Sequence, residues 1–448
     1  MEVHPAVMEA LVRRCEDGEI AAFLAQGDGC GWCRHPVRLR GHQDAVDSAT
    51  GARSVVFSSS RAPDGVVLKG CGNRRQSRCP TCAAIYRADA RHLVRAGLEG
   101  GKGVDASVAT HPAVLVTLTA PGFGSVHRTR SGGPCTPGHP RRRCAHGRPQ
   151  TCFVHHTDTE HALGTPLCPD CYDYEGQVLH NALTPELWRR MSIYVPRHLA
   201  RVLGVTQAEL KRRLRVSYVR VAEFQRRGAI HLHVIVRLDR ADGACPDVEV
   251  QALQQACLSA ARAVSARHGR GATAFGTELE VQPLDRENSR AGRLAAYVAK
   301  YATKSSDDSG GLDRRIRSAD ELDHRKLAPH PTRLAATAWS LGSEPDLASL
   351  HLRRHAHCFG YGGHFLSKSR CYSTTLGALR SARSAWRMAQ RPGHENDGPH
   401  VSYESRWRAV GVGWANHGER LLAEQNRDAL AYERRLAREE EANDKHAA

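Results

Sequence analysis

The sequence predicts an α+β protein whose core is an antiparallel sheet with helices packed on it. Its strand-like runs lie at Ala113–Ala120, Val216–Gln225, Ala229–Leu238 and Thr277–Leu284. The second and third runs are joined by Arg226-Arg227-Gly228, a tight turn in which the glycine supplies the positive φ of a hairpin. Helix-forming stretches surround these strands, so the sheet is expected to pack against helices.

The segments around the strands are assigned from composition and apolar spacing. Residues 1–28 are expected to form a short helix, and residues 29–110 to hold clustered cysteines and an Arg-rich helix at Ala83–Ala96. Residues 121–175 are rich in Gly, Pro, Arg and His, so they are expected to be an insertion. Further helices are predicted at Leu183–Leu203, Val248–His268 and Ala295–Lys304.

The C-terminal third follows a polar break at residues 305–330, which marks the expected domain boundary. Two short helices are predicted after this break, at Pro331–Leu341 and Leu347–Cys358. The last residues alternate Arg and Glu at helical spacing, so residues 391–448 are expected to form a polar helical tail.

Residues 331–390 allow two interpretations. Two short helices followed by a basic, glycine-bearing segment are typical of a small DNA-binding module. In that module Lys368 and Arg370 would contact phosphates, and Tyr372 would contact a phosphate or stack on a base. Alternatively, the same residues form a helical cap on the core.

A pair of histidines in the third strand is the first candidate for chemistry. His231 and His233 flank Leu232, and side chains at i and i+2 of a strand point to the same face. The hairpin register can be counted from an apex at Arg227, which places Glu223 opposite His231. Two imidazoles and a carboxylate suit Mn²⁺ in ligand softness, while a bound phosphate could bring Mg²⁺ with it.

Two alternatives to this metal site remain open. The histidines could be half-exposed strand residues whose hydrogen bonds are satisfied. One of the glutamates Glu278 and Glu280, which share a face of a later strand, could replace Glu223 as the carboxylate ligand.

A helix with two tyrosines and two lysines is the second candidate. Tyr297, Lys300, Tyr301 and Lys304 lie at i, i+3, i+4 and i+7, so they form one stripe on the predicted helix. A buried helix with two packing tyrosines would also have this composition. However, two phenols and two ammonium groups make a poor core face and a good face for phosphate.

The fifteen cysteines cluster in Cys-x-x-Cys units, which favours zinc-binding thiolates over disulfides in a chain of 448 residues without a predicted secretion signal. The first cluster combines two such units, so its four expected ligands are Cys30, Cys33, Cys79 and Cys82. Cys71 lies nearby in the sequence and could replace one of them.

The second cluster lies between Cys135 and Cys171 and contains more candidates than one tetrahedral site needs. The preferred ligands are Cys152, Cys168 and Cys171, with Cys144 or a histidine as the fourth. Two zinc ions are also possible. Each site offers four protein ligands, so the zinc ions are expected to be structural.

Three motifs give the chain a resemblance to a known superfamily. They are the strand Val114–Pro121, the histidine pair within Gly228–Asp239, and the tyrosine-lysine motif within Ala296–Lys304. With these motifs the chain resembles replication initiators of the HUH endonuclease superfamily, most closely the rolling-circle initiators of actinobacterial plasmids. It also resembles, more distantly, the two-tyrosine initiators of single-stranded phages.

The resemblance implies an HUH-type core and a DNA endonuclease and strand transferase that starts plasmid rolling-circle replication. His231 and His233 would hold Mn²⁺ or Mg²⁺. Tyr297 would attack origin DNA that is single-stranded or unpaired at the nick site, and Tyr301 would be a second nucleophile. A host helicase and polymerase are implied as partners.

Two rival functions are less consistent with these motifs. An HUH relaxase or transposase would use the same chemistry for DNA transfer, but relaxases usually place their tyrosine before the histidines. A zinc-containing DNA-binding regulator without enzyme activity would explain the cysteines, but not the histidines, the facing carboxylate and the tyrosine-lysine stripe together.

The expected organisation divides the chain into five consecutive parts. They are an N-terminal zinc-ribbon-like region (1–110), a catalytic domain (111–304) with a zinc-binding insertion (121–175), a linker (305–330), a small DNA-binding or helical cap module (331–390) and a polar helical tail (391–448).

The charge of the chain agrees with a nucleic-acid partner. Lysine and arginine number 64 against 47 acidic residues, which gives a formal net charge of +17. Such an excess attracts polyanions, although biased coding towards arginine would also produce it. No apolar run is long enough for a membrane span, so a cytoplasmic location is expected.

Overall fold

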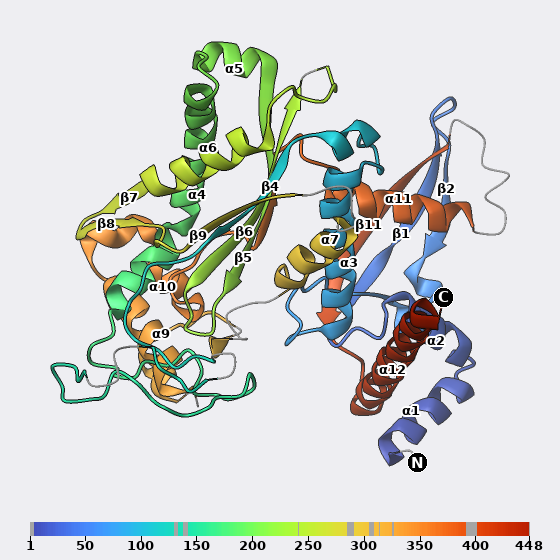
Figure 1. Ribbon diagram of the computed structural model, residues 1–448. Coiled ribbons are helices and arrows are strands. Elements are labelled where there is room, and N and C mark those ends of the chain that lie inside the picture. The colour runs from blue at the N-terminus through green and yellow to red at the C-terminus, as the bar shows by residue number, and fades with distance from the viewer. Residues whose placement is uncertain are drawn as a thin grey trace. The chain divides into compact units, whose positions relative to one another are not determined.

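The chain forms two compact units in the computed structural model, which describes residues 4–129, 133–137, 142–240, 242–284, 291–303, 309–312, 314–324, 327–390 and 401–447. The first unit combines residues 1–88 with residues 377–448, and the second contains residues 89–376. Both the blue and the red ends of the ribbon in Figure 1 therefore belong to the first unit.

The second unit contains most of the regular structure. Its helices and strands are β4 (Ala113–Leu118), α4 (Tyr174–Val202), α5 (Gln207–Arg213), β5 (Leu214–Phe224), β6 (Ile230–Arg240), α6 (Val250–Ala263), β7 (Ser265–His268), β8 (Gly271–Ala274), β9 (Leu279–Pro283), α7 (Ala291–Tyr301), α8 (Asp320–Asp323), α9 (Pro329–Leu341), α10 (Leu352–His355) and β10 (Leu366–Lys368).

A five-stranded sheet forms the centre of this unit. Its strand order is β10–β5–β6–β4–β9, and every neighbouring pair is antiparallel. The predicted α+β class with an antiparallel sheet is thus confirmed. All four predicted strands occur in this sheet, together with β10, which the sequence analysis did not predict.

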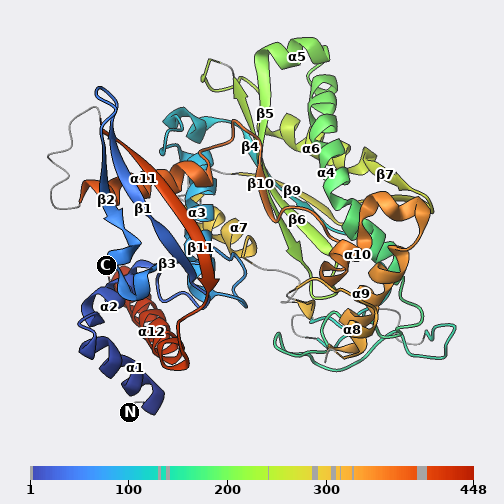
Figure 2. The same cartoon turned by 180° about the vertical axis from the view of Figure 1, so that it is seen from behind.

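The two faces of the sheet differ because side chains alternate along each strand. Leu232, Val234 and Val236 of β6 are buried in the main core, to which α4 and α6 also contribute. His231 and His233 alternate with them and point to the other face. Figures 1 and 2 show α4 and α6 on one side of β5 and β6 and α7 on the other, and α7 contacts β5.

Several predicted helices have different bounds in the structure; the one predicted at Ala295–Lys304, for example, is α7 at Ala291–Tyr301. The helix predicted from Leu183 begins at Tyr174, where the Asp173 side chain accepts a hydrogen bond from the Gly176 amide at 2.8 Å. The helix predicted to reach His268 ends at Ala263, because the next residue is already extended and the chain enters the hairpin of β7 and β8.

The C-terminal part of the second unit contributes side chains to the main core. The predicted helix at Pro331–Leu341 is confirmed as α9, which contacts α4. The helix predicted at Leu347–Cys358 is interrupted, because His351 adopts a left-handed backbone with φ 49°. The strand β10 then adds to the edge of the central sheet, with Lys368 opposite Val219.

The first unit is built from both ends of the chain. Its elements are α1 (Pro5–Glu16), α2 (Ile20–Gly29), β1 (Val37–Asp47), β2 (Arg53–Ser58), β3 (Val67–Lys69), β11 (Val401–Val412) and α12 (His417–Ala447), while α3 (Pro80–Glu99) and α11 (Leu376–Ala389) cross the boundary between the units. In its sheet, β1 pairs with β2, β3 and β11, in each case antiparallel.

Two expectations for this unit are corrected. Residues 1–28 form two helices rather than one, because the chain turns at Gly18 with φ 69°. Residues 401–412 form a strand rather than a helical tail, and only α12 retains the predicted helix. In the described residues of the whole chain, no helix is both long and apolar enough to cross a lipid bilayer.

Candidate active site and metal-binding groups

The hairpin of β5 and β6 brings the predicted carboxylate beside the histidines. Its register pairs Glu223 with His231 and Val221 with His233, which confirms the register counted from an apex at Arg227. Gly228 has φ 76°, as the turn requires. The three polar side chains therefore share one face of the sheet.

The hydrogen bonds of these side chains are specific. His233 is only 4% exposed and its Nε2 lies 3.2 Å from Oε2 of Glu223. Nδ1 of His231 lies 3.2 Å from Oγ1 of Thr119, which fixes the orientation of that ring. Burial, together with the nearby His233, lowers the pKa of His231 to about 4, so its imidazole is neutral at pH 7.

Glu280, one of the two other predicted carboxylates, lies farther from the histidines. In the sheet, Thr117 of β4 lies between His233 on one side and Glu280 of β9 on the other. Glu280 is therefore two strands from His233, about 10 Å in the hydrogen-bonding direction. This leaves Glu223, on the adjacent strand, as the carboxylate that contacts the histidine pair.

Two tyrosines of α7 meet the histidines. The ring centroid of His233 lies 5.4 Å from that of Tyr297 and 4.7 Å from that of Tyr301, and the second pair is stacked. The tyrosine rings lie 4.9 Å apart. The histidine pair and the tyrosine pair, which are 64 residues apart in the sequence when counted from His233 to Tyr297, thus form one cluster.

The two tyrosines differ in environment. Tyr297 is 42% exposed. Burial and a hydrogen bond with Tyr297 raise the pKa of Tyr301 above its ordinary value, which disfavours its tyrosinate. Lys300 is exposed on the same helix. Lys304, predicted for the same stripe, lies outside the described residues.

The first cysteine cluster has four thiols in metal-binding proximity. They are Cys33, Cys71, Cys79 and Cys82, and their sulfur atoms lie within 4.8 Å of one another. The Cys33–Cys79 and Cys33–Cys82 sulfur distances are both 3.6 Å. A tetrahedral zinc with Zn–S bonds of about 2.3 Å needs sulfur atoms about 3.8 Å apart, so the spacing fits.

Cys71, and not the predicted ligand Cys30, belongs to this four-thiol group. Cys30 is the C-cap of α2, and its thiol lies 3.3 Å from the Gly27 carbonyl oxygen. This geometry keeps Cys30 out of the four-thiol group, although it is buried beside it. The nearby Cys71 instead completes the set.

The insertion forms two further groups, as the alternative with two ions requires. The first contains His127, Cys135, Cys152 and His156, and the second contains Cys144, His146, Cys168 and Cys171. Cys152 is therefore separated from Cys168 and Cys171, with which it was expected to share an ion. The reason is a backbone contact, because the Cys152 amide donates to the Cys135 carbonyl at 3.0 Å.

His127 is a candidate ligand that the sequence does not indicate. Its Nδ1 lies 3.1 Å from Nε2 of His156, and the other nitrogen of His156 lies 2.6 Å from Glu160. A carboxylate on the outer nitrogen is the usual support of a metal-binding histidine. The spacing of His127 from Cys135 follows no common ligand motif, so only the folded loop identifies it.

The residues near β10 that were expected to contact DNA differ in their exposure and hydrogen bonds. Tyr372 is fully buried and donates its hydroxyl to the Val94 carbonyl at 3.3 Å, so its expected role on DNA is wrong. Lys368 donates to the carbonyls of Ser369 and Arg370 at 3.2 and 3.1 Å. Burial lowers the pKa of Lys368. Arg370 is exposed, as a phosphate contact would require.

Comparison with known proteins identifies the family of the chain. The sequence model of the RepSA family, described as the replication initiator protein of pSAM2, matches residues 19–428. A replication initiator protein of Streptomyces ambofaciens is 37% identical over 459 residues, covering 97% of this chain and 96% of that protein. No solved structure matches the chain. The chain therefore belongs to the RepSA family of replication initiator proteins.

Proposed function

We propose that this replication initiator nicks plasmid origin DNA by HUH-type chemistry and later rejoins the strand. The observation that carries the proposal is the contact of both Tyr297 and Tyr301 with the ring of His233. A phenol beside imidazoles and a carboxylate can attack a phosphodiester and retain the broken end as a covalent ester. The family and the resemblance of the motifs support the same reaction.

Tyr297 is the proposed first nucleophile. Its ring is 42% exposed, so a DNA strand can reach its hydroxyl. Tyr301 is stacked on His233 and its pKa is raised, which makes it the weaker nucleophile in the absence of DNA. We assign Tyr301 to the later step, in which the replicated circle is closed.

His231, His233 and Glu223 would hold Mn²⁺ or Mg²⁺. The 3.2 Å between Nε2 of His233 and Oε2 of Glu223 suits two neighbouring ligands of an octahedral ion, which lie about 3 Å apart. In the described part of the chain these three residues are not a group whose ligand atoms all lie within 4.8 Å of one another. Binding by all three therefore requires a side-chain rotation. When bound, the cation would withdraw electron density from the scissile phosphate.

The chemical step balances without a nucleotide cofactor. The hydroxyl oxygen of Tyr297 bonds to phosphorus, and the bond between phosphorus and the 3′ oxygen breaks. The phenol proton leaves to a base, while the 3′ oxygen takes up a proton and becomes a hydroxyl that a host polymerase extends. The 5′-phosphotyrosine conserves the ester bond for rejoining, and the exposed ammonium group of Lys300 would stabilise the charge that develops.

Substitution of the nucleophile is the direct test. We expect Tyr297→Phe to abolish the covalent DNA adduct, because phenylalanine has no hydroxyl, while Tyr301→Phe retains adduct formation. Labelled origin DNA is incubated with Mn²⁺ and protein, and the products are separated on a denaturing gel. An undiminished adduct with Tyr297→Phe would assign the attack to Tyr301. No adduct with the unaltered chain would favour a non-enzymatic DNA-binding protein.

Loss of either histidine should separate cleavage from binding. We expect His231→Ala and His233→Ala each to lower cleavage at least about a hundredfold, because electrostatic stabilisation of the phosphate is lost. Binding to uncleaved DNA should stay within about twofold, as measured by fluorescence anisotropy. Cleavage at the normal rate in either variant would exclude that histidine as a ligand.

We also propose that the three cysteine and histidine groups hold structural zinc. Each offers four protein ligands, which leaves no open position for a substrate. Imidazole and thiolate groups bind Zn²⁺ in preference to Mn²⁺ or Mg²⁺.

A further inference from the structure

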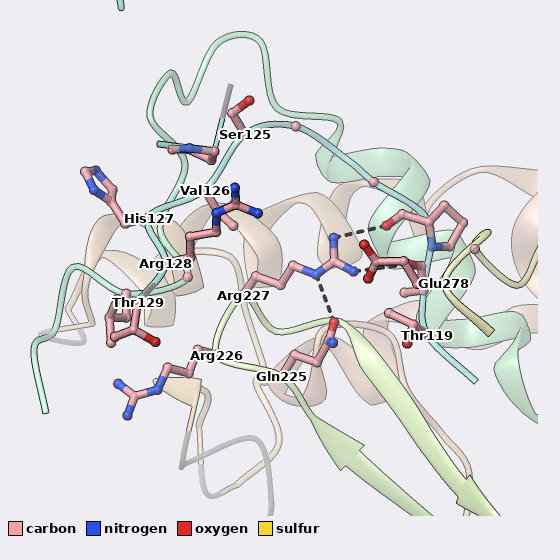
Figure 3. A pocket seen from close by; sticks show the side chains of 18 of the residues that line it. Thr119, Ser125, Val126, His127, Arg128, Thr129, Gln225, Arg226, Arg227 and Glu278 are labelled. Atoms are coloured by element: carbon pink, nitrogen blue, oxygen red, sulfur yellow. Dashed lines mark hydrogen bonds between the residues drawn. The ribbon is translucent and has the colours of Figure 1, made fainter. Parts of the chain in front are cut away.

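A cavity of about 650 Å³ lies where the chain leaves β4, where β5 turns into β6, and where the insertion packs on that turn. Figure 3 shows Arg128, Arg226 and Arg227 around it, with Thr119 and Gln225 at its base. Its volume is in the usual range for sites that bind small ligands. It has no role in the chemistry described above.

The cavity adjoins the candidate active site through Thr119. Thr119 lines it and is hydrogen-bonded to His231 at 3.2 Å. Gln225 also lines the cavity. It comes two residues after Glu223, directly beyond the end of β5. Two residues of a strand span about 7 Å, which is close to the reach of one nucleotide. A strand whose phosphate lies at the histidines would therefore place its neighbouring nucleotide here.

Arg227 gives the cavity a half-buried positive charge. Its guanidinium donates to three neutral oxygens: the side chain of Gln225 at 2.9 Å and the carbonyls of Pro121 and Ala120 at 3.0 and 3.2 Å. Among the residues that the structure describes, no carboxylate forms an ion pair with Arg227, although the charge of Glu278, another lining residue, interacts with it electrostatically. The guanidinium therefore keeps a charge that an anion in the cavity can meet.

The other two arginines are also held by neutral groups. Arg226 donates to the carbonyls of Asp158 and Glu160, and Arg128 donates to the carbonyl of Thr136 at 2.9 Å. Carbonyl oxygens orient a guanidinium but do not cancel its charge. With Asp158 and Glu278 as the acidic lining residues, three arginines leave a net positive cavity.

Contacts outside the cavity hold its lining residues in place. His127 and Arg128 line it, and His127 belongs to the group with Cys135, Cys152 and His156. On the opposite side Gly164 packs directly under the turn, because a Cβ there would lie 2.5 Å from the carbonyl carbon of Arg226. The lining arginines are therefore positioned before a ligand arrives.

We propose that this cavity is a subsite for the nucleotide next to the scissile phosphate of a single-stranded DNA. Its phosphate would contact Arg128 and Arg226, and its sugar or base edge would contact Thr119 and Gln225. Glycines in the lining allow the backbone of the nucleic acid to approach closely. The proposal rests on the proposed nicking function for its position, but its binding test requires no cleavage.

Two kinds of variant test the subsite independently. Gly122 lines the cavity, and a Cβ at this position meets no atom within 4 Å, so Gly122→Leu fills the cavity without removing charge. Arg128→Ala removes a lining charge. Arg262→Ala is the matched control, because Arg262 is exposed on α6, which covers the opposite face of the sheet.

The probe is a fluorescein-labelled twelve-residue oligothymidylate, titrated by anisotropy without Mn²⁺ or Mg²⁺ at several salt concentrations. We expect Arg128→Ala to raise Kd about tenfold, as for loss of one charged hydrogen bond. Gly122→Leu should raise Kd by a similar factor, because its side chain occupies space that the nucleotide needs. For Arg128→Ala, the slope of log K against log salt should fall by about 0.7, the value for one phosphate of a single strand. Arg262→Ala should change Kd less than about twofold.

The controls decide between the outcomes. Gly122→Ala should lie between the unaltered chain and Gly122→Leu, and it serves if the larger residue prevents folding. Wild-type affinity for Gly122→Leu in a folded protein, or for Gly122→Ala together with Arg128→Ala, overturns the subsite. An equal loss with Arg262→Ala also overturns it, because only total charge would then matter.

The nicking function fails by a different result. Tyr297→Phe should bind the oligothymidylate as tightly as the unaltered chain. If the unaltered chain forms no adduct but Gly122→Leu still weakens binding, the subsite stands and the nicking proposal falls. If adducts form at the normal rate and Gly122→Leu binds normally, only the subsite falls.

Discussion

Among single residues, cysteines that look equivalent in the sequence have different surroundings. Cys30 belongs to a Cys-x-x-Cys unit, yet its thiol is directed to the Gly27 carbonyl. Cys71 has no such partner spacing, yet it lies with Cys33, Cys79 and Cys82. Hydrogen bonds from Cys33 and Cys82 hold the pKa of Cys79 far below its ordinary value, which favours the thiolate that binds zinc.

Zinc content should reveal this difference. We expect Cys71→Ser and Cys152→Ser each to lose about one zinc ion per chain, because each removes one of four ligands. Cys30→Ser should retain the full content and is the matched control. Plasma mass spectrometry of purified protein measures the metal. A loss of zinc with Cys30→Ser and full content with Cys71→Ser would restore the ligand set based on the two Cys-x-x-Cys units.

Some site residues can be placed from the sequence and others cannot. Glu223 could be placed beside His231 from the sequence, because a hairpin turn and a two-residue period fix which residues face each other. His127 could not, because its neighbours Cys152 and His156 lie on a loop without a repeating geometry. Tyr372 is buried because it contacts α3, where its hydroxyl donates to the Val94 carbonyl. No pattern in the sequence around Tyr372 indicates this contact.

At the scale of elements, α4 holds the hairpin turn in place. The side-chain amide of Asn181 donates to the Gly228 carbonyl at 2.9 Å and accepts from the Ile230 amide at 2.9 Å. Gln177 donates to the Arg227 carbonyl at 2.8 Å. These contacts satisfy backbone groups that the tight turn leaves unpaired, so the helix fixes the end of the strand that carries the histidines.

A histidine of the same helix should make stability depend on pH. Burial lowers the pKa of His180 to about 3, whereas the unfolded chain has about 6.5. Between these values the unfolded state binds more protons, so stability is present above pH 6.5 and is lost as pH falls. We expect His180 alone to lower the free energy of unfolding by about 2 kcal/mol between pH 7 and pH 5.

Urea unfolding at both pH values measures this effect. His180→Leu lacks the titrating group, so its stability should fall less over the same interval. Arg227, which lies near enough to lower the same pKa, is present in both proteins and does not confuse the comparison. An identical pH dependence in the two proteins would mean that the pKa of His180 is the same in the folded and the unfolded chain.

For the molecule as a whole, the first unit depends on contacts between the two ends of the chain. β1 pairs along its length with β11, and α1 packs on α12. Arg14 is 2% exposed and pairs with Glu419 at 2.7 Å, with Glu19 at 2.6 Å and with Asp64. Glu419 is equally buried, so this ion pair ties residue 14 to a helix more than 400 residues later.

Removal of that carboxylate should destabilise the first unit. We expect Glu419→Ala to lower its free energy of unfolding by about 3 kcal/mol, because the buried guanidinium of Arg14 loses a partner. The remaining contacts with Asp64 and Glu19 keep the cost at the lower end of the usual range. Glu433→Ala, at an exposed position of α12, should change it by less than about 0.5 kcal/mol.

Urea unfolding, with probes in each unit, measures the difference. Trp414 in the first unit reports the local transition, since it packs on Phe23 and Trp32. Equal stability of Glu419→Ala and Glu433→Ala would contradict the role assigned to the pair. A shift confined to the second unit would contradict it as well.

The sequence by itself determined the features that arise from short-range geometry: the hairpin register, the shared face of His231, His233 and Glu223, and the spacing of Tyr297 and Tyr301 on one helix. Each follows from a period of 2 or 3.6 residues and from one turn. Tertiary structure alone decided that α7 contacts the histidine pair, that the cysteines divide into three groups, and that β1 pairs with β11. These depend on contacts between residues far apart in the chain, which packing selects and local patterns do not encode.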